Sequence, residues 1–263
     1  MRLCVLVSAL EQDTDALPGR MGLECDAVIV NQTDHDERQS VLWQGRQLKI
    51  LMRKERGVGR SRNLALDEAW GDLVLFSDED IVYDRGYAAR IVQAFRRRPH
   101  ADILLFNVRV NEERRTYWNE KEKAVHRFNC GRYPTFCAAA RLSSLRSAGV
   151  RFSLLFGGGA PYSNGEDSLF FTECLRKGLK IRALPVTIGR EEARKSTWFH
   201  GYDKKFFYDR GVLYAFLYGR LAELWALRFV VTKKKIMCGE VPPIKAIALM
   251  RKGIAKGRKL CRG

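Results

Sequence analysis

The sequence has no apolar run long enough to cross a bilayer. Within its most apolar segment, residues 204–231, the longest uncharged stretch covers only residues 211–219, whereas a membrane-spanning helix needs about 20 predominantly apolar residues. The apolar stretch at the N-terminus is too short for the core of a signal peptide, and no cleavage site follows it. We therefore expect no membrane-spanning segment, and we interpret residues 2–8 as a first strand.

Cysteines and histidines form no informative pattern. The seven cysteines are an odd number and include no C-x-x-C pair, which argues against a disulfide framework and against a zinc site. This usage predicts reduced thiols and a cytoplasmic location. By default, the four histidines are surface or structural residues. A chain of 263 residues with 46% hydrophobic content is expected to bury a sizeable core, as one large domain or as one domain with an appendage.

Negative charge is in the minority. The chain holds 47 Lys and Arg against 30 Asp and Glu, which gives a net charge of +17. Residues 233–263 contain ten Lys or Arg and one Glu, so this segment alone contributes +9. Such a balance predicts a polyanionic partner, which is nucleic acid, an anionic membrane surface or a phosphate-bearing substrate.

Short apolar runs alternate with segments of helical composition along the first 110 residues. This alternation predicts an α/β fold with a doubly wound, mainly parallel sheet. A less regular region follows, in which we expect a strand near 135–140 and helices near 142–148 and 165–177. The expected elements of the first region are strands at 2–8, 26–31, 48–52, 73–76 and 102–108 and helices at 57–70 and 84–97.

Three consecutive acids, Asp78, Glu79 and Asp80, follow the expected buried strand at 73–76 almost directly. Open α/β sheets bind their ligands outside the carboxyl ends of the strands. Adjacent carboxylates repel one another unless cations or hydrogen-bond donors share their site, and Mg²⁺ is often held by one or two carboxylates together with phosphate oxygens. The triplet is therefore either a site for a divalent cation and a diphosphate or a solvated turn before the next helix.

A second acidic pair, Glu166 and Asp167, opens the helix expected near 165–177. Acids at a helix N-terminus are favoured by the helix dipole, so the pair either caps the helix or belongs to a site. The glycine loop before it, residues 157–159, either moves over a bound ligand, because glycine allows close backbone approach, or forms only a sharp turn.

Taken in order, four features resemble glycosyltransferase family 2, the large group of inverting sugar-nucleotide transferases with the GT-A fold. They are an opening strand pair, a Gly-x-Gly-x-x-Arg-Asn segment at 57–63, the acids at 78–80 and Gly-Glu-Asp at 165–167. Ser61-Arg62-Asn63 is similar to the family's Ala-Arg-Asn segment, and the two acidic groups are similar to its D-x-D and Glu-Asp motifs. The likeness covers roughly residues 1–200.

The resemblance implies an inverting transfer that depends on a divalent cation, Mg²⁺ or Mn²⁺. Asp80 would hold the cation, Asp78 would hold either the cation or the donor ribose, and Glu79 would lie in the donor site. The cation would neutralise charge on the nucleoside diphosphate leaving group. Asp167 would act as the general base toward the acceptor hydroxyl, with Glu166 orienting the acceptor or the base.

The resemblance also places the donor nucleotide at the end of the second strand. Where the family has an Asp-rich turn for the nucleobase and ribose, this chain has Asn31, Gln32, Thr33 and Asp34. Asn31 both donates and accepts hydrogen bonds and Asp34 keeps one carboxylate nearby, so a uridine diphosphate sugar is the expected donor. The opening strand ends in Ser-Ala-Leu rather than in the family's Pro-x-Tyr-Asn.

Basic and late-chain residues complete the predicted site. Arg60 or Arg62 would pair with the diphosphate, because a guanidinium's forked donors match phosphate oxygens, and Asn63 follows them in the same motif. His200 is either the third metal ligand of some relatives or a structural residue. Trp198 either lines the sugar or acceptor pocket or packs in the core. The residues assigned to the acceptor are Gly158, Gly159 and Trp198.

We predict a catalytic domain at 1–203, with a nucleotide-sugar-binding half at 1–108 and an acceptor-binding half at 109–203. A basic, partly apolar helical extension would follow at 204–263. In the helix expected after Pro243, lysines gather on one side and apolar residues, including Met250 and Ile254, on the other. Such a helix either lies in a membrane interface, where each basic residue near an anionic surface contributes about 1 kcal/mol, or packs on its own domain.

The expected acceptor is a glycan or a polyprenyl-diphosphate-linked chain of surface polysaccharide synthesis, reached by peripheral contact with the anionic inner face of the cell membrane. No nucleic acid is expected. The alternative from another class is a basic nucleic-acid-binding module without catalytic activity, but acids at strand and helix ends would repel a polyanion. A dinucleotide-binding fingerprint at 57–62 fails because Arg62 replaces its third glycine.

Overall fold

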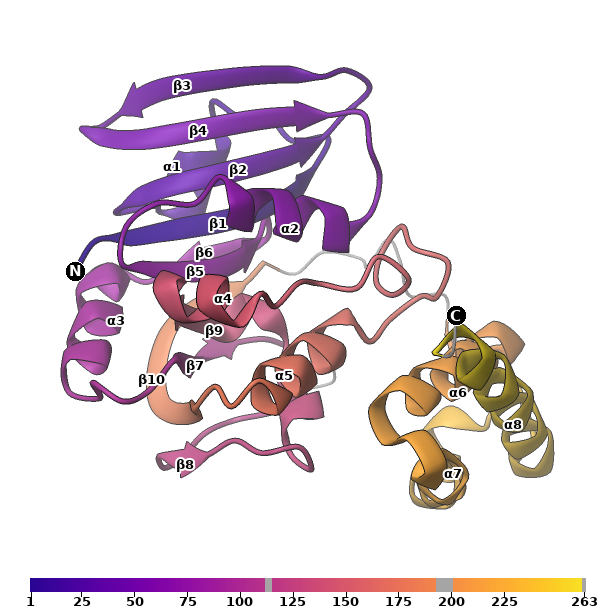
Figure 1. The fold of residues 1–263 in the computed structure, drawn as a ribbon. Helices are drawn as coiled ribbons and strands as arrows, with labels where there is room; N and C mark the ends of the chain where they lie inside the picture. Colours follow the sequence, from indigo (N-terminus) through magenta and orange to yellow (C-terminus); the bar gives the residue numbers. More distant parts are fainter. Residues whose placement is uncertain (112–114, 193–200, 262–263) are drawn as a thin grey trace.

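The computed structural model describes residues 1–111, 115–192 and 201–261. One large sheet with its covering helices forms the body of the protein, and three helices at the C-terminus form a separate group beside it (Figure 1). The predicted α/β class with a helical C-terminal region is confirmed. The predicted division at residue 203 stays a prediction, although apolar side chains of the last three helices form a cluster of their own.

The strands are β1 (Leu3–Leu10), β2 (Asp26–Gln32), β3 (Glu37–Trp43), β4 (Arg46–Arg53), β5 (Leu73–Asp78), β6 (Ile81–Tyr83), β7 (Ile103–Arg109), β8 (Lys123–Ala124), β9 (Ala138–Arg141) and β10 (Ile181–Glu191). Their order is β3-β4-β2-β1-β5-β9-β7-β10-β6, and β8 pairs with β10. The run β4-β2-β1-β5 is parallel, as is the pair β7 and β10. The remaining pairings are antiparallel, so the sheet is parallel from β4 to β5, with β3 antiparallel at its edge, and mixed beyond β5.

The helices are α1 (Leu17–Met21), α2 (Val58–Asp67), α3 (Tyr87–Arg96), α4 (Leu142–Ala148), α5 (Glu166–Arg176), α6 (Lys204–Tyr218), α7 (Ala222–Met237) and α8 (Pro243–Leu260). Short 3-10 turns lie at η1 (Cys130–Arg132), η2 (Thr135–Cys137) and η3 (Gly219–Leu221). Consecutive residues Val5, Leu6 and Val7 of β1 are all fully buried, as expected of a central strand covered on both faces.

The carboxyl ends of the parallel strands meet at one edge of the sheet. Ser8 of β1 pairs in register with Asp78 of β5, and Leu10 pairs with Gln32 of β2. Helix α2 contacts β1 and β2, and the Ser61 hydroxyl of this helix hydrogen-bonds the Ser8 hydroxyl at 2.8 Å. The residues singled out by the sequence are therefore brought to the edge where α/β sheets bind ligands.

Helices α6 and α8 are in direct backbone contact. A Cβ atom on Gly253 would lie 2.1 Å from the carbonyl oxygen of Tyr208, and one on Gly211 would lie 2.1 Å from that of Met250. The Met250 and Ile254 side chains are buried in a cluster shared with α6 and α7. This part of the apolar face thus packs on its own extension, as the second interpretation predicted, although Ile244 remains 85% exposed.

The close contact predicts the effect of one added methyl group. We expect Gly253→Ala to lower the free energy of unfolding by about 1–3 kcal/mol, because the methyl group would overlap the Tyr208 carbonyl and force α8 away from α6. Urea unfolding followed by circular dichroism measures the change. Gly239→Ala is the matched control, since a Cβ there meets nothing within 4 Å. Equal losses in both variants would contradict the close contact.

Among the helices of the described residues, none has both the length and the apolar content needed to cross a bilayer.

Candidate active site

Three acids from two distant parts of the chain converge on one arginine. Arg62 of α2 donates from Nη1 to Glu166 Oε1 at 3.3 Å and to Asp167 Oδ1 at 2.9 Å, and from Nη2 to Asp78 Oδ1 at 3.0 Å. Asp78 ends β5, whereas Glu166 and Asp167 open α5. The two acidic motifs therefore form one continuous site, with Arg62 between them.

Local packing fixes the Arg62 guanidinium at this point. Its side chain is 5% exposed and lies over the Phe152 ring, with Cζ 5.4 Å from the ring centroid. The next residue, Asn63, hydrogen-bonds both main-chain groups of Phe152 and so holds that ring beside α2. Burial disfavours the charge of Arg62, but Asp78, Asp167 and Glu166 outweigh burial and raise its pKa.

Asp167 receives two hydrogen bonds on one oxygen. Both Thr135 Oγ1 of η2 and Arg62 Nη1 donate to Asp167 Oδ1. Burial raises the pKa of the Asp167 carboxyl, and Arg62 and Thr135 oppose that rise. The carboxylate is thus held in one orientation, and its pKa is shifted in the direction that a general base requires.

Glu166 lies between Asp167 and the glycine loop. Burial, followed by the charge of Asp167, raises the pKa of the Glu166 carboxyl to about 7. A Cβ atom on Gly157 would lie 3.0 Å from Glu166 Cδ, so the loop packs directly against this acid. Because both side chains bind Arg62, the pair does more than cap α5. Their catalytic roles stay predictions.

Asp80 lies among other acids, and no cationic side chain of the described residues pairs with it. Burial raises the pKa of the Asp80 carboxyl to about 7, and the negative charges of Asp78, Glu191 and Glu79 contribute to this rise. A divalent cation, which takes oxygen ligands, would relieve this repulsion. Asp78 and Asp80 therefore fit a cation shared with a diphosphate.

Within residues 1–111, 115–192 and 201–261, no three His, Cys, Asp or Glu side chains are grouped so as to hold a metal ion. Within the described part of the chain, substrate oxygens or water would therefore have to join Asp80 and Asp78 as ligands of a cation, as is common for Mg²⁺. His200 and Trp198 lie outside the described residues, so their assignments as metal ligand and acceptor contact stay predictions.

The predicted nucleobase residues support the edge of the sheet. Asn31 is fully buried, and its side-chain amide exchanges two hydrogen bonds with the main chain of Gln12, at 2.8 and 3.1 Å. Gln32 accepts from the Gly57 amide at 2.7 Å and ties β2 to the start of α2. Asp34 is exposed and pairs with His35 Nδ1 at 2.8 Å. Contact of these residues with a nucleobase stays a prediction.

The remaining donor residues separate into exposed and buried groups. Arg60 is exposed on the first turn of α2 and pairs with Glu55 at 2.8 Å. Of the two arginines predicted for the diphosphate, Arg60 is thus the one that can exchange a surface carboxylate for a phosphate, whereas Arg62 is committed to three acids. Glu79 accepts from the Leu10 amide at 2.8 Å and so joins the ends of β5 and β1.

The glycine loop interlocks with the start of α2. Val58 donates its amide to the Gly158 carbonyl at 2.9 Å, and a Cβ atom on Gly159 would lie 3.0 Å from Gly57 Cα. Gly159 has a φ of +77°, which strains any side-chain-bearing residue. The loop is therefore a sharp turn packed against α2, and the predicted acceptor contact of Gly158 and Gly159 stays a prediction.

Thr135 and Gln12 were missed from the sequence. Thr135 holds the proposed base, and Gln12 holds Asn31. Thr135 lies in η2, where the sequence predicted only a strand, Gln12 lies in a loop, and a single threonine or glutamine carries no motif. No signal in the sequence distinguishes them from other short polar residues.

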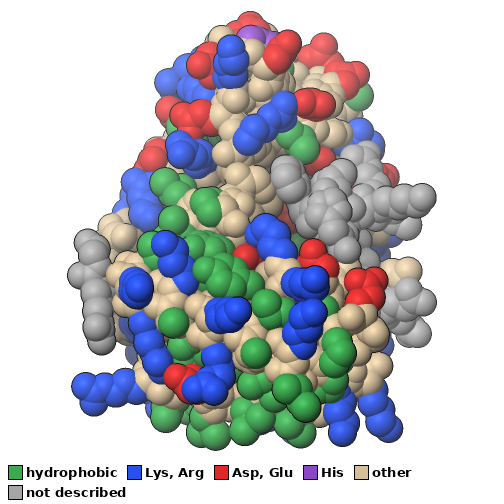
Figure 2. All heavy atoms as spheres, turned by 90° about the vertical axis from the view of Figure 1, so that its right-hand side faces the viewer, with side chains coloured by type: hydrophobic (Ala, Val, Ile, Leu, Met, Phe, Trp, Pro, Cys, Tyr) green, Lys and Arg blue, Asp and Glu red, His purple; other side chains and the backbone are tan. Residues whose placement is uncertain are grey.

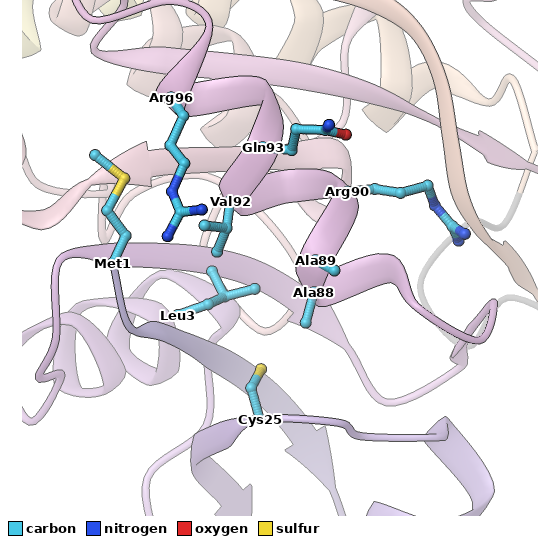
Figure 3. Close-up of a pocket in the computed structure, with 9 residues that line it drawn as sticks. All are labelled: Met1, Leu3, Cys25, Ala88, Ala89, Arg90, Val92, Gln93 and Arg96. Carbon is cyan, nitrogen blue, oxygen red and sulfur yellow. The ribbon is translucent and has the colours of Figure 1, made fainter.

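A different pocket, of about 570 Å³, lies at the opposite edge of the sheet, where β1 begins beside α3 (Figure 3). Met1, Leu3, Val92 and Cys25 contribute to its lining. Burial raises the pKa of the Cys25 thiol to about 11, so this sulfur is not a reactive thiolate near neutral pH. None of the site acids borders this pocket, and we assign it no part in the chemistry.

Comparisons with known proteins agree with this geometry. A model described as glycosyl transferase family 2 matches residues 5–152. The crystal structure of S. aureus TarS 1–349 matches with a TM-score of 0.63 at 15% identity, covering 97% of this chain and 81% of that one. Its complex with UDP-GlcNAc matches with a TM-score of 0.61 at 16% identity, covering 91% and 74%.

A more distant likeness is to the mannosyltransferase PcManGT from Pyrobaculum calidifontis, in complex with GDP-Man and Mn²⁺. Its TM-score is 0.52 at 14% identity, covering 97% of this chain and 86% of that one. A search of curated proteins returned no match. At these identities the solved structures establish the fold, and they confirm the expected GT-A arrangement of the sheet and its helices.

Proposed function

This chain belongs to glycosyl transferase family 2 and is a glycosyltransferase, and from that premise we propose that it moves a sugar from a nucleoside diphosphate donor to an acceptor hydroxyl. The observation that carries the proposal is the convergence of Asp78, Glu166 and Asp167 on Arg62 at the carboxyl edge of the sheet. That edge is where α/β folds bind nucleotides. We set aside the nucleic-acid-binding alternative because this cluster of acids would repel a nucleic acid.

We take the donor to be a UDP-sugar. The structural neighbour TarS binds UDP-GlcNAc and the neighbour PcManGT binds GDP-Man, which supports a nucleotide sugar as the donor class. Asn31 and Asp34 lie at the end of β2, and Asn31 orients the Gln12 main chain at the same edge. Arg60 is placed to meet the diphosphate.

Asp80 and Asp78 are the side chains that would hold a divalent cation. When bound, such a cation neutralises the charge that develops on the departing nucleoside diphosphate. Asp78 also binds Arg62, so the Asp78 carboxylate would contact both the cation and the arginine that holds Asp167. Both Mg²⁺ and Mn²⁺ suit an all-oxygen site of this kind.

Asp167 is the proposed general base. The acceptor oxygen forms its bond to the anomeric carbon as the bond from that carbon to the diphosphate breaks, and the acceptor proton passes to Asp167. Thr135 and Arg62 hold the Asp167 carboxylate for this transfer, while Glu166 orients the acceptor. A single displacement from the opposite face inverts the anomeric configuration.

The acceptor is proposed to be a glycan or a lipid-linked chain of surface polysaccharide synthesis. The positive charge of residues 233–263 favours phosphate-bearing acceptors and anionic membrane surfaces. We therefore place the enzyme in the cytoplasm, in peripheral contact with the inner face of the cell membrane. A panel of nucleotide sugars, assayed for release of free nucleotide, would identify the donor.

The metal proposal is tested by Asp80→Asn. In calorimetric titrations with UDP, we expect Mn²⁺-dependent binding by the wild type and binding weaker by about tenfold or more in the variant, because an amide lacks the charge that attracts the cation. Glu240→Gln, an exposed acid between α7 and α8, is the control and should bind UDP as the wild type does. Binding of UDP that needs neither Mn²⁺ nor Asp80 would remove the metal site from the proposal.

A further inference from the structure

A second cavity, of about 660 Å³, lies where the C-terminal helices meet α5. Its walls come from residues 127–131, from α5 and from the junction of α6 and α7. Its volume is within the range of small-molecule and cofactor sites. Its lining includes none of the predicted donor-site residues and none of the acids that bind Arg62.

Aromatic rings form one wall of the cavity. Trp225 stacks on Tyr218, with centroids 4.9 Å apart and planes at 15°, and it faces Phe128 at 6.2 Å and 23°. Phe128 is 60% exposed, and the neighbouring leucines Leu221 and Leu224 are 58% and 63% exposed. Large apolar side chains gathered in this way mark a binding surface rather than a packing defect.

The apolar surface continues from the cavity along α7. Three- and four-residue spacing separates Leu221, at the end of η3, from Leu224, Leu227 and Val231 of α7, and each is at least 48% exposed. This spacing places them on one face of the helix. Figure 2 shows apolar side chains gathered at the lower end of the molecule, among Lys and Arg side chains. A cavity and an exposed stripe therefore form one continuous apolar surface.

Three arginines line the same cavity, Arg127, Arg176 and Arg228. Arg127 lies over the Phe128 ring at 4.6 Å, and Arg228 lies over the Trp225 ring at 5.1 Å. Neither of these two forms an ion pair within the described residues, and the contact of Arg176 with Glu173 is long, at 3.8 Å. Guanidinium groups without close carboxylates favour an anionic ligand, and their forked donors suit phosphate.

Helix α5 connects the cavity to the proposed base. Ser168, Thr172 and Arg176 all line the cavity, and their four-residue spacing places them on one face of α5. Asp167 directly precedes Ser168 in the first turn of the helix. The lining therefore follows α5 for about 12 Å, and its end at Ser168 is the end nearest in sequence to the proposed base.

Resting on the proposed function, we infer that this cavity binds the lipid part of the acceptor. The aliphatic chain lies against Trp225, Leu221 and Leu224, and its phosphate lies among the three arginines. The acceptor is thus an amphiphile in which phosphate joins a hydrocarbon chain to the sugar end, and that end reaches Asp167 along α5.

The observations favour a lipid over other anionic ligands. A single-stranded nucleic acid would also use stacked rings and arginines, but it would leave the leucine stripe of α7 uncovered. A free glycan would need neither the leucines nor the three arginines. A hydrocarbon chain with a phosphate uses all three features, because its burial removes apolar surface from water while the phosphate meets the arginines.

Binding of farnesyl monophosphate, a soluble prenyl phosphate, tests the inference. The measurement is equilibrium dialysis with EDTA present, so that the proposed cation site does not contribute. We expect saturable binding by the wild type and at least tenfold weaker binding by the double variant Arg127→Gln/Arg228→Gln. Leu224→Asp should weaken binding to a similar degree, because it places a charge on the apolar wall. These three residues are exposed, so folding should be preserved.

The matched control is Lys233→Gln/Lys252→Gln, which removes the same charge from exposed positions outside the cavity and should change binding less than twofold. Mn²⁺-dependent UDP binding, measured on every variant, should be unchanged. If the wild type binds UDP but not farnesyl monophosphate, this inference is wrong and the proposed function stands. If it binds neither, both fail.

Two competitors identify other occupants of the cavity. If phosphatidylglycerol vesicles displace farnesyl monophosphate and lose binding in the same variants, the cavity recognises bilayer lipid, and its assignment to the acceptor is wrong. If a uridine 12-mer displaces the prenyl phosphate, the cavity binds nucleic acid and the lipid assignment is likewise overturned. Failure of both to compete supports the acceptor assignment.

Discussion

Asp167→Asn is expected to lower the rate of sugar transfer by about 10²–10⁴-fold, the usual contribution of a positioned general base. The amide keeps the size of the carboxylate but cannot take the acceptor proton. Binding of UDP with Mn²⁺ should persist, because Asp80 and Asp78 are untouched. The measurement is the transfer rate at saturating donor, alongside calorimetry with UDP. Full transfer by the variant would exclude Asp167 as the base.

The pH dependence of the transfer rate provides a second test of Asp167 as the base. Burial raises the pKa of Asp167, and it raises the pKa of the adjoining Glu166 to about 7. A base acts only when deprotonated, so the wild-type rate should rise as Asp167 loses its proton, at a pH above the ordinary range of an aspartate, and then level off. Glu173→Gln, on the same helix outside the acid cluster, should keep this rise. Asp167→Asn should lose it, and a rise retained in that variant would assign the titration to another group.

Arg62→Met is expected to lower the free energy of unfolding by about 3 kcal/mol near pH 8, the cost of leaving buried carboxylates without their cation. Asp78, Glu166 and Asp167 would then face one another with no positive charge between them. Methionine keeps most of the apolar contact with Phe152. Chemical unfolding at pH 8 and pH 5 measures the effect.

The loss should be smaller at pH 5. A carboxyl whose pKa is raised in the folded state contributes stability at low pH that is lost as the pH rises through that pKa, and Glu166 already has a pKa of about 7. Protonation at low pH therefore relieves the repulsion that the variant exposes. Arg60→Met, two residues away and exposed with a surface partner, should change stability by less than about 0.5 kcal/mol. Equal losses in both variants would remove Arg62 as the centre of the acid cluster.

The sequence predicts much of the fold because its central strands are apolar. Val5, Leu6 and Val7 lie in an uninterrupted apolar run, as buried parallel strands do, and the acids after β5 mark the edge where ligands bind. Strand β3, at 37–43, was missed because six of its seven side chains are exposed and its first four, at 37–40, are polar. Strand β10 was missed because its apolar residues are interrupted by Arg182 and Pro185.

The sequence predicted that the two acidic motifs share one site, but it did not predict the hydrogen bonds that join them. Motif order identifies Asp78, Asp80, Glu166 and Asp167, since each follows or opens a regular element. It does not reveal that Arg62 binds all three acids, because that contact joins α2 to α5, which lie far apart in the sequence. The same limit applies to α8, whose apolar face covers α6 and α7, since periodicity identifies such a face but not its partner.

The missing side chain of Gly165 has a consequence for any shortened form of the protein. A Cβ atom there would lie 2.4 Å from the Leu213 side chain of α6, and Asp209 of the same helix accepts hydrogen bonds from the Ser163 amide and hydroxyl at 3.0 Å. Helix α6 thus packs directly against the segment that precedes Glu166 and Asp167 and holds it in place. Truncating the chain before residue 204 would loosen the acids themselves, so an inactive fragment would reveal nothing about whether the tail meets a membrane.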